Sequence, residues 1–236
     1  MKISGKKAVV FGGTSGIGLA TVKMLAQEGA SVVAVSRDPS KSGPLPSGVT
    51  VKSCDVRDAA AVEKLLNEIG TIDILVSAAT GGKRAIGPFV EMDMDGFKGS
   101  FDKLWGYANV VRFGARHVVD GGSITLLSGS PAREFPKELS ALSSVGGAVE
   151  ALVRTVAKEV APRIRINVVS PGLIDTPMYG ETNEAKRAES FREMARGKLI
   201  PRAGTADEAA QGVMFVITND FVTGTIVDVD GGSLLS

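Results

Sequence analysis

The segment from Lys7 to Met24 constrains the fold most, because an apolar run, a glycine-rich turn and a helical pattern follow one another without a gap. The apolar run, residues 8–11, is typical of a parallel strand that is covered on both faces. Gly12 permits a tight turn, Gly16 lets the backbone approach a pyrophosphate, and Gly18 lets the helix pack closely on the sheet. The unpaired N–H groups that open the helix would then face the phosphate. The segment predicts nucleotide binding, although a plain glycine-rich turn would share the pattern.

The composition fits one large core without a nucleic-acid or membrane partner. The chain has 236 residues, of which 44% are hydrophobic, so we expect a single domain over residues 1–236. Lys and Arg number 27 against 26 for Asp and Glu, a net charge of +1, and no basic block is present. No apolar stretch approaches the ~18 residues of a membrane span. The single cysteine, Cys54, fits a reducing compartment, so we expect a cytoplasmic protein. Around His117, the only histidine, no ligand spacing supports a metal site.

Strand and helix patterns alternate along the rest of the chain. They predict an α/β fold with a doubly wound parallel sheet of about seven strands between two layers of helices, and ligands at its carboxyl edge. A charged segment, residues 178–201, is expected to form a small helical lid over the pocket. The expected strands are 8–11, 31–35, 49–54, 72–77, 123–128, 164–169 and 223–230, and the longer helices are 16–28, 59–69, 93–119, 137–161 and 206–218.

The end of the second expected strand indicates which cofactor is used. A small residue, Ser36, followed by Arg37 makes room for a 2′-phosphate and neutralises it, which favours NADP(H) over NAD(H). In the alternative reading Arg37 is a solvated charge and Asp38 takes the acidic role toward the ribose. Asp55, after the third strand, is placed either to bond the adenine amino group or to cap the next helix, and Asp58 is equally placed for the cap.

Several motifs in order resemble those of the short-chain dehydrogenase/reductase family. They are Gly12-x-x-x-Gly16-x-Gly18, Asp55, the helix 148–160, the segment 165–172, and Thr223-Gly224 with Asp230-Gly231-Gly232. The resemblance covers essentially the whole chain and implies a Rossmann-type fold, a nicotinamide cofactor and a small-molecule substrate. It also implies a homodimer or homotetramer through the helices near 93–119 and 137–161.

The cofactor-binding residues that we expect combine the family motifs with the strand ends. They are Gly12, Thr14, Ser15, Gly16, Ile17, Gly18, Ser36, Arg37, Asp55, Val56, Ser77, Ala78, Ala79, Pro171, Gly172, Ile174 and Thr176.

The chain departs from the family at the catalytic positions. By the resemblance, a Tyr exchanges the proton, a Lys one helical turn later lowers its pKa, a Ser orients the substrate carbonyl, and an Asn relays protons. Alignment on the flanking motifs puts Leu142 at the Tyr position, Gly146 at the Lys position and Gly129 at the Ser position, while Lys103 falls at the Asn position within one residue. Loss of general acid–base help lowers a rate by about 10²- to 10⁴-fold.

Two functions are compatible with these substitutions. In the first, the chain is an NADP(H)-dependent oxidoreductase that acts by hydride transfer on a carbonyl, imine or activated alkene with a non-standard proton donor. In the second, it is a catalytically silent NADP(H)-binding sensor, scaffold or partner subunit. The candidate catalytic residues are Lys103, Ser128 and Ser130. We hypothesise that the Lys103 ammonium enters the space beside Gly146; alternatively Lys103 is a solvated helix charge, and either serine bonds only nearby backbone.

Overall fold

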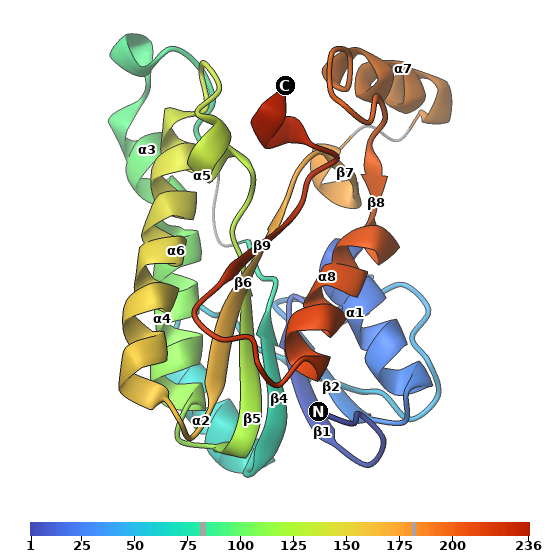
Figure 1. Ribbon diagram of the computed structural model, residues 1–236, viewed down its shortest axis with the longest axis vertical. Helices are drawn as coiled ribbons and strands as arrows, with labels where there is room; N and C mark the ends of the chain where they lie inside the picture. The colour runs from blue at the N-terminus through green and yellow to red at the C-terminus, as the bar shows by residue number, and fades with distance from the viewer. Residues whose placement is uncertain (81–83, 181–182) are drawn as a thin grey trace.

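Seven short runs rich in valine and isoleucine pair as parallel strands in the order β3-β2-β1-β4-β5-β6-β9 (Figure 1). The computed structural model describes residues 1–80, 84–180 and 183–236. The strand order reverses between β1 and β4, and a crevice at the carboxyl ends of the strands is expected where such a reversal occurs. The strands are β1 (Lys7–Phe11), β2 (Ser31–Ser36), β3 (Thr50–Ser53), β4 (Ile72–Ser77), β5 (Val118–Leu127), β6 (Arg165–Pro171) and β9 (Ile226–Val229).

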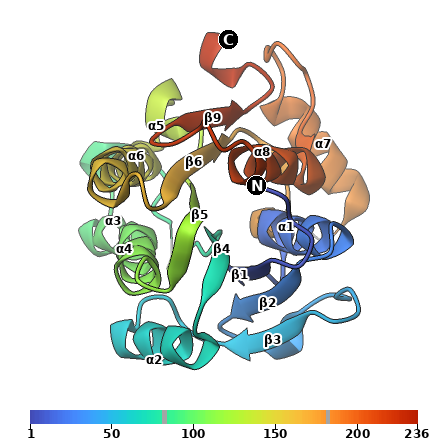
Figure 2. The same ribbon diagram turned by 60° about the horizontal axis from the view of Figure 1, so that its bottom comes forward.

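Helices cover both faces of this sheet, so the expected three-layer architecture is confirmed (Figure 2). One face carries α2 (Ala59–Ile69), α4 (Asp102–Gly114) and α6 (Ser140–Val160). The other carries α1 (Gly16–Gln27) and α8 (Ala206–Thr218). Alternate residues of each strand enter one core or the other: Val9 packs with the first group of helices, and Val10 with the second.

Side chains cap the first turns of α2 and α8. The Asp58 side chain accepts the Ala61 N–H and caps α2, so the capping role falls to Asp58 rather than Asp55. At the start of α8 the Thr205 side chain and the Glu208 side chain satisfy each other's backbone N–H groups in a capping box.

The expected helix over residues 93–119 is wrong in its length. The structure has α3 (Met94–Ser100) and α4, with Phe101 between them, and residue 118 already belongs to β5. Val118 pairs with Ile72 of β4, and a register irregularity separates this pair from the main ladder at Ser123. The apolar residues near 118 therefore extend the sheet rather than the helix.

The remaining elements lie around the carboxyl edge. A short helix, α5 (Pro131–Glu134), occupies part of the expected loop before α6, and α6 begins at Ser140 rather than near residue 137. Helix α7 (Glu184–Met194) lies in the expected lid segment. The additional elements are β7 (Ile174–Asp175), which pairs with β8 (Gly204–Thr205), and the 3-10 turns η1 (Pro39–Lys41), η2 (Phe89–Glu91), η3 (Pro177–Tyr179) and η4 (Ser233–Leu235).

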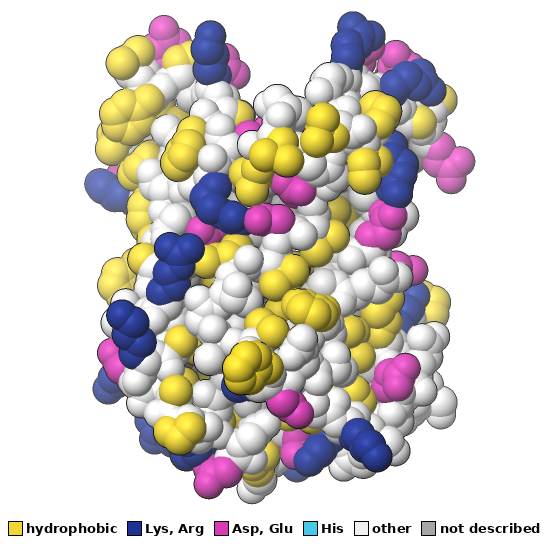
Figure 3. All heavy atoms as spheres, in the orientation of Figure 1, with side chains coloured by type: hydrophobic (Ala, Val, Ile, Leu, Met, Phe, Trp, Pro, Cys, Tyr) yellow, Lys and Arg dark blue, Asp and Glu magenta, His cyan; other side chains and the backbone are white. Residues whose placement is uncertain are grey.

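The surface carries charges of both signs in a mixed pattern. On the face shown in Figure 3, blue and magenta side chains are interspersed and neither sign covers the face. None of the helices in the described part of the chain combines the length and apolar character needed to cross a bilayer.

Candidate cofactor and substrate site

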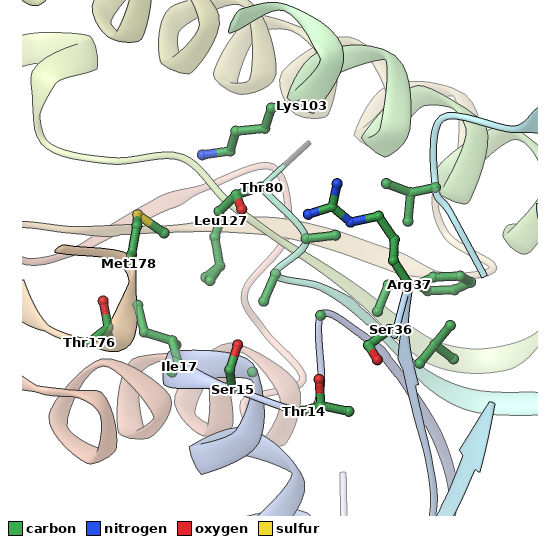
Figure 4. A pocket seen from close by; sticks show the side chains of 18 of the residues that line it. Thr14, Ser15, Ile17, Ser36, Arg37, Thr80, Lys103, Leu127, Thr176 and Met178 are labelled. Carbon is green, nitrogen blue, oxygen red and sulfur yellow. The ribbon is translucent and has the colours of Figure 1, made fainter. Parts of the chain in front are cut away.

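A cavity of about 750 Å³ follows the carboxyl edge of the sheet and brings together most of the residues expected to bind the cofactor (Figure 4). Its size lies within the range of small-molecule and cofactor sites. The expected residues on its walls are Gly12, Thr14, Ser15, Gly16, Ile17, Gly18, Ser36, Arg37, Asp55, Val56, Ala78, Ala79, Pro171 and Thr176. Lys103 and Ser128 line the same cavity.

The glycine turn is too tightly packed for larger side chains. A Cβ atom at Gly12 would lie 2.7 Å from the backbone nitrogen of Ala79, and Gly12 has a φ of +77°, which favours glycine. A Cβ atom at Gly18 would clash with the carbonyl oxygen of Gly12. Helix α1 opens at Gly16 and carries no acidic residue in its first turn. The positive end of the helix therefore borders the cavity without a competing carboxylate in that turn, and this geometry fits a dinucleotide pyrophosphate.

The side chains at the end of β2 fit a phosphate on the ribose. The Ser36 hydroxyl oxygen is buried and has no partner within the described chain, and the Arg37 guanidinium forms no ion pair with a described residue. Figure 4 shows Arg37 extending into the cavity. Asp38 is already engaged: its carboxylate accepts hydrogen bonds from Ser40 and pairs with Lys41 at 3.1 Å. The alternative role of Asp38 toward the ribose would thus compete with existing contacts.

Asp55 lies on the cavity wall, and its carboxylate is held by Arg57. The Arg57 side chain donates to both carboxylate oxygens at 2.6–3.1 Å, and its backbone N–H donates at 3.0 Å. The hydrogen bond from Arg57 holds the pKa of Asp55 below its usual range. Arg57 also pairs with Asp102 of α4, so Asp55 is an anchored acceptor rather than a free one.

A second cavity of about 200 Å³ adjoins the first. Lys103, Ser128 and Thr176 line both cavities, while Gly172 and Ile174 line only the smaller one. The smaller cavity also has apolar lining residues that the larger one lacks, Leu139, Leu142, Val145 and Tyr179, together with the polar Arg84 and Ser100.

Two of the expected site residues line neither cavity. Ser77 is fully buried within β4, between Phe11 and Leu126 of the neighbouring strands. Ser130 is 4% exposed, and its hydroxyl donates to the Glu134 carboxylate at 3.0 Å. Both residues are therefore buried near the carboxyl edge of the sheet and do not form part of either cavity wall.

Lys103 stands where the two cavities meet. In Figure 4 its ammonium extends over Thr80 and Leu127 toward Met178. The ammonium donates to the Ser128 carbonyl oxygen at 2.8 Å and lies 5.6 Å from the centre of the Tyr107 ring. Burial lowers the pKa of Lys103 to about 8, and the nearby Arg84 cation adds to the shift. Lys103 forms no ion pair with a residue that the structure describes, so its charge is available to a ligand.

Tyr107, one turn further along α4, is a poor proton donor. Its side chain is fully buried, and this burial raises the pKa of the phenol. The ring supports the Lys103 ammonium instead.

The side of α6 that faces α5 has no room for a larger residue at Gly146. A Cβ atom there would lie 2.8 Å from the Cβ atom of Ala132. The close neighbour of Gly146 is therefore Ala132, whereas Gly147 has no atom within 4 Å of its Cβ direction. Lys103 and Gly146 line the same smaller cavity, and the Lys103 ammonium bonds to the Ser128 carbonyl oxygen there.

A buried carboxylate next to Ser128 was not predicted from the sequence. Glu150, 5% exposed, lies on the buried face of α6 with Val149 and Val153. It accepts a hydrogen bond from the Ser128 hydroxyl at 3.1 Å and pairs with Arg133 at 3.3 Å. The available signal was an acidic residue within the apolar stripe of a helix.

Comparisons with known proteins agree with this geometry. A family model described as enoyl-(acyl carrier protein) reductase matches residues 12–233. The 3-oxoacyl-[acyl-carrier-protein] reductase FabG of Thermotoga maritima is 30% identical over 100% of both chains. Carbonyl reductase family member 4 of Danio rerio is 33% identical over 95% of this chain and 96% of its own. The crystal structure of a small-chain dehydrogenase in complex with NADPH is 33% identical, covers 99% of this chain and 100% of its own, and has a TM-score of 0.85.

The fold and the cavity are those of a dinucleotide-binding α/β protein. With the family model and the relatives above, the chain belongs to the short-chain dehydrogenase/reductase family.

Proposed function

We propose that the chain is an NADP(H)-dependent oxidoreductase that transfers hydride to and from a carbonyl, imine or activated alkene, with Lys103 as the proton donor. The observation that carries the proposal is the position of Lys103, which lines both the large cavity and the smaller apolar one. A group at this junction can reach a cofactor in the first cavity and a substrate in the second.

The larger cavity supplies the cofactor site in this proposal. The backbone of the glycine turn and the start of α1 would hold the pyrophosphate. Arg37, with Ser36 and Lys41 on the same wall, would hold the 2′-phosphate, which favours NADP(H) over NAD(H). When bound, the nicotinamide supplies the hydride, and the protein positions its reactive face against the substrate.

The smaller cavity supplies the substrate site. Leu142 and Gly146, at the positions of the family's Tyr and Lys by the resemblance, contribute surface without acid–base groups. A Lys side chain at position 146 would have to displace Ala132 of α5. The Lys103 ammonium, whose burial brings its pKa to about 8, is protonated at neutral pH and can deliver a proton to an oxygen or nitrogen that receives hydride.

The remaining features of the proposal rest on the resemblance and on composition. We infer one domain over residues 1–236, a cytoplasmic protein, and a homodimer or homotetramer through α4 and α6. We also infer that the segment 178–201 closes over the substrate, because Met178 and Tyr179 line the smaller cavity.

The test is transfer of label from the cofactor. NADPH that carries deuterium stereospecifically at C4 is incubated with a panel of ketones, cyclic imines and enones, and the products are analysed by mass spectrometry. Deuterium in a product supports the proposal. Tight binding of NADPH with no transfer to any member of a broad panel contradicts it and supports the sensor or scaffold alternative.

A further inference from the structure

Ser128 contacts two charged residues, Lys103 through its backbone and Glu150 through its side chain. Its carbonyl oxygen accepts from the Lys103 ammonium at 2.8 Å, and its hydroxyl lies 3.1 Å from the Oε1 atom of Glu150. Ser128 is 7% exposed and lines both cavities. The orientation of its hydroxyl therefore determines which ligand groups it can bond.

Glu150 receives a guanidinium hydrogen bond on the same oxygen atom. The Nε atom of Arg133 donates to Oε1 of Glu150 at 3.3 Å, and the two terminal nitrogens of Arg133 bind the carboxylate of Asp228. The Glu150 side chain is 7% exposed, against 29% for Arg133 and 30% for Asp228. The Oε1 atom of Glu150 thus receives two donors, the Ser128 hydroxyl and the Arg133 Nε–H, so it is the acceptor in its contact with Ser128.

We propose that Glu150 is a positioning residue that fixes the Ser128 hydroxyl as a hydrogen-bond acceptor toward the cavity, so that the substrate presents a hydroxyl or N–H donor there. Because the Ser128 proton is committed to Glu150, only the lone pairs of Oγ remain for a ligand. Lys103 is then the donor to the reacting oxygen or nitrogen, and Ser128 receives a neighbouring O–H or N–H. Hydroxy-carbonyl compounds and compounds with an amide or amine N–H beside the reacting carbon have this pattern.

A second carboxylate on the short helix offers a matched control. Glu134 accepts from the Ser130 hydroxyl and pairs with Lys198, so it repeats the serine–carboxylate–cation arrangement, yet neither Glu134 nor Ser130 lines either of the two cavities described above. A change at Glu134 perturbs the same neighbourhood without reaching the ligand.

The experiment compares two ligands of nearly the same shape, benzamide and acetophenone, in the presence of saturating NADP⁺. Both carry a carbonyl, but only benzamide has N–H donors, and NADP⁺ cannot reduce either compound. We expect the wild-type protein to bind benzamide about fivefold more tightly in ligand-observed NMR titrations, the ratio that one net hydrogen bond gives.

The variants test which residue sets this ratio. Glu150→Met releases the Ser128 proton and Ser128→Ala removes the hydroxyl, so both should bring the affinity ratio close to one. Glu150→Gln keeps an acceptor oxygen for both Ser128 and Arg133, and it should retain the ratio, as should Glu134→Met. Equal affinities in the wild type, no binding of either ligand, or an unchanged ratio in Ser128→Ala overturns the inference.

The inference rests on the proposed function only for the identity of the two cavities. The binding ratio is measured without turnover, so the two fail separately. If no deuterium is transferred but benzamide still binds more tightly than acetophenone, only the proposed activity is contradicted. If deuterium is transferred but the two ligands bind equally, only the role of Glu150 is contradicted.

Discussion

The two ends of the site are built in different ways. At the glycine turn, backbone atoms and a helix terminus form the cavity wall, and close contacts such as that between Gly12 and Ala79 leave room for no other residue. At the opposite end, the wall is made of side chains: Lys103 from α4, Ser128 from the end of β5, and Leu142 from α6. A backbone site tolerates few substitutions, while a side-chain site can be rebuilt without disturbing the fold. The cofactor end is therefore expected to vary less than the side-chain end among chains that share this fold.

Among the variants considered, replacement of Lys103 should have the largest effect, and that effect should be on turnover rather than on cofactor binding. In Lys103→Met the turnover number for a reduced substrate is expected to fall by about 10²- to 10⁴-fold, because the proton donor is lost. The dissociation constant of NADPH, measured by fluorescence titration, should change little. Lys98→Met is a suitable control, because Lys98 lies on the neighbouring helix α3 and, among the residues that the structure describes, forms an ion pair only with the exposed Asp95. Unchanged turnover in Lys103→Met would remove Lys103 from the reaction.

Replacement of Gly18 by a larger residue should weaken cofactor binding at the glycine turn. The Cβ atom of a valine would clash with the Gly12 carbonyl oxygen, so either the turn or α1 must shift. We expect NADPH affinity in Gly18→Val to fall on the order of 100-fold, together with a lower melting temperature by circular dichroism. Gly43→Val provides the comparison, because the nearest atom to a Cβ there is 3.8 Å away, at ordinary contact distance. Full NADPH affinity in Gly18→Val would refute a backbone-built phosphate site.

Removal of the Arg37 guanidinium should separate the two cofactors. In Arg37→Ala the affinity for NADPH is expected to fall by roughly 10- to 100-fold, the effect of losing charge-assisted hydrogen bonds, while that for NADH stays nearly constant. Arg112→Ala, an exposed position on α4, should leave both affinities unchanged. Equal weakening of NADPH and NADH would contradict a 2′-phosphate role for Arg37.

The pH dependence of the reduction rate should test Lys103 at the side-chain end of the site. An ammonium with a pKa of about 8 is protonated below that pH and loses its proton above it. The rate of reduction at saturating substrate and NADPH should therefore be flat below pH 8 and fall about tenfold per unit above it. Lys103→Arg, which does not titrate in this range, should lack the decline. A wild-type rate that stays constant between pH 7 and pH 10 would contradict general acid catalysis by Lys103.

The sequence predicts what local signals encode and misses what depends on distant packing. The glycine turn and the helix over residues 206–218 each depend on signals within a few residues, and the structure has the corresponding elements where they were expected. The contact between Ser128 and Glu150 spans 22 residues and depends on how α6 packs beside β5. The acidic residue in the apolar stripe of α6 indicates a buried carboxylate, but no local pattern indicates its partner. Likewise, the helix expected over residues 93–119 gave no sign that Val118 pairs with Ile72.

Substitutions at the two adjacent glycines of α6 should give the smallest effect, and they test how closely α5 packs against α6 at Gly146. Gly147→Ala meets open space within a helix and should raise the free energy of unfolding by up to ~1 kcal/mol, a few degrees in melting temperature. Gly146→Ala places its Cβ atom 2.8 Å from that of Ala132 and should lower the free energy of unfolding by roughly 1–3 kcal/mol instead. The double variant Gly146→Ala/Ala132→Gly should recover most of that loss in thermal or urea unfolding. If Gly146→Ala stabilises the protein as much as Gly147→Ala does, the packing of α5 does not exclude a side chain at this position, and another cause must account for the glycine.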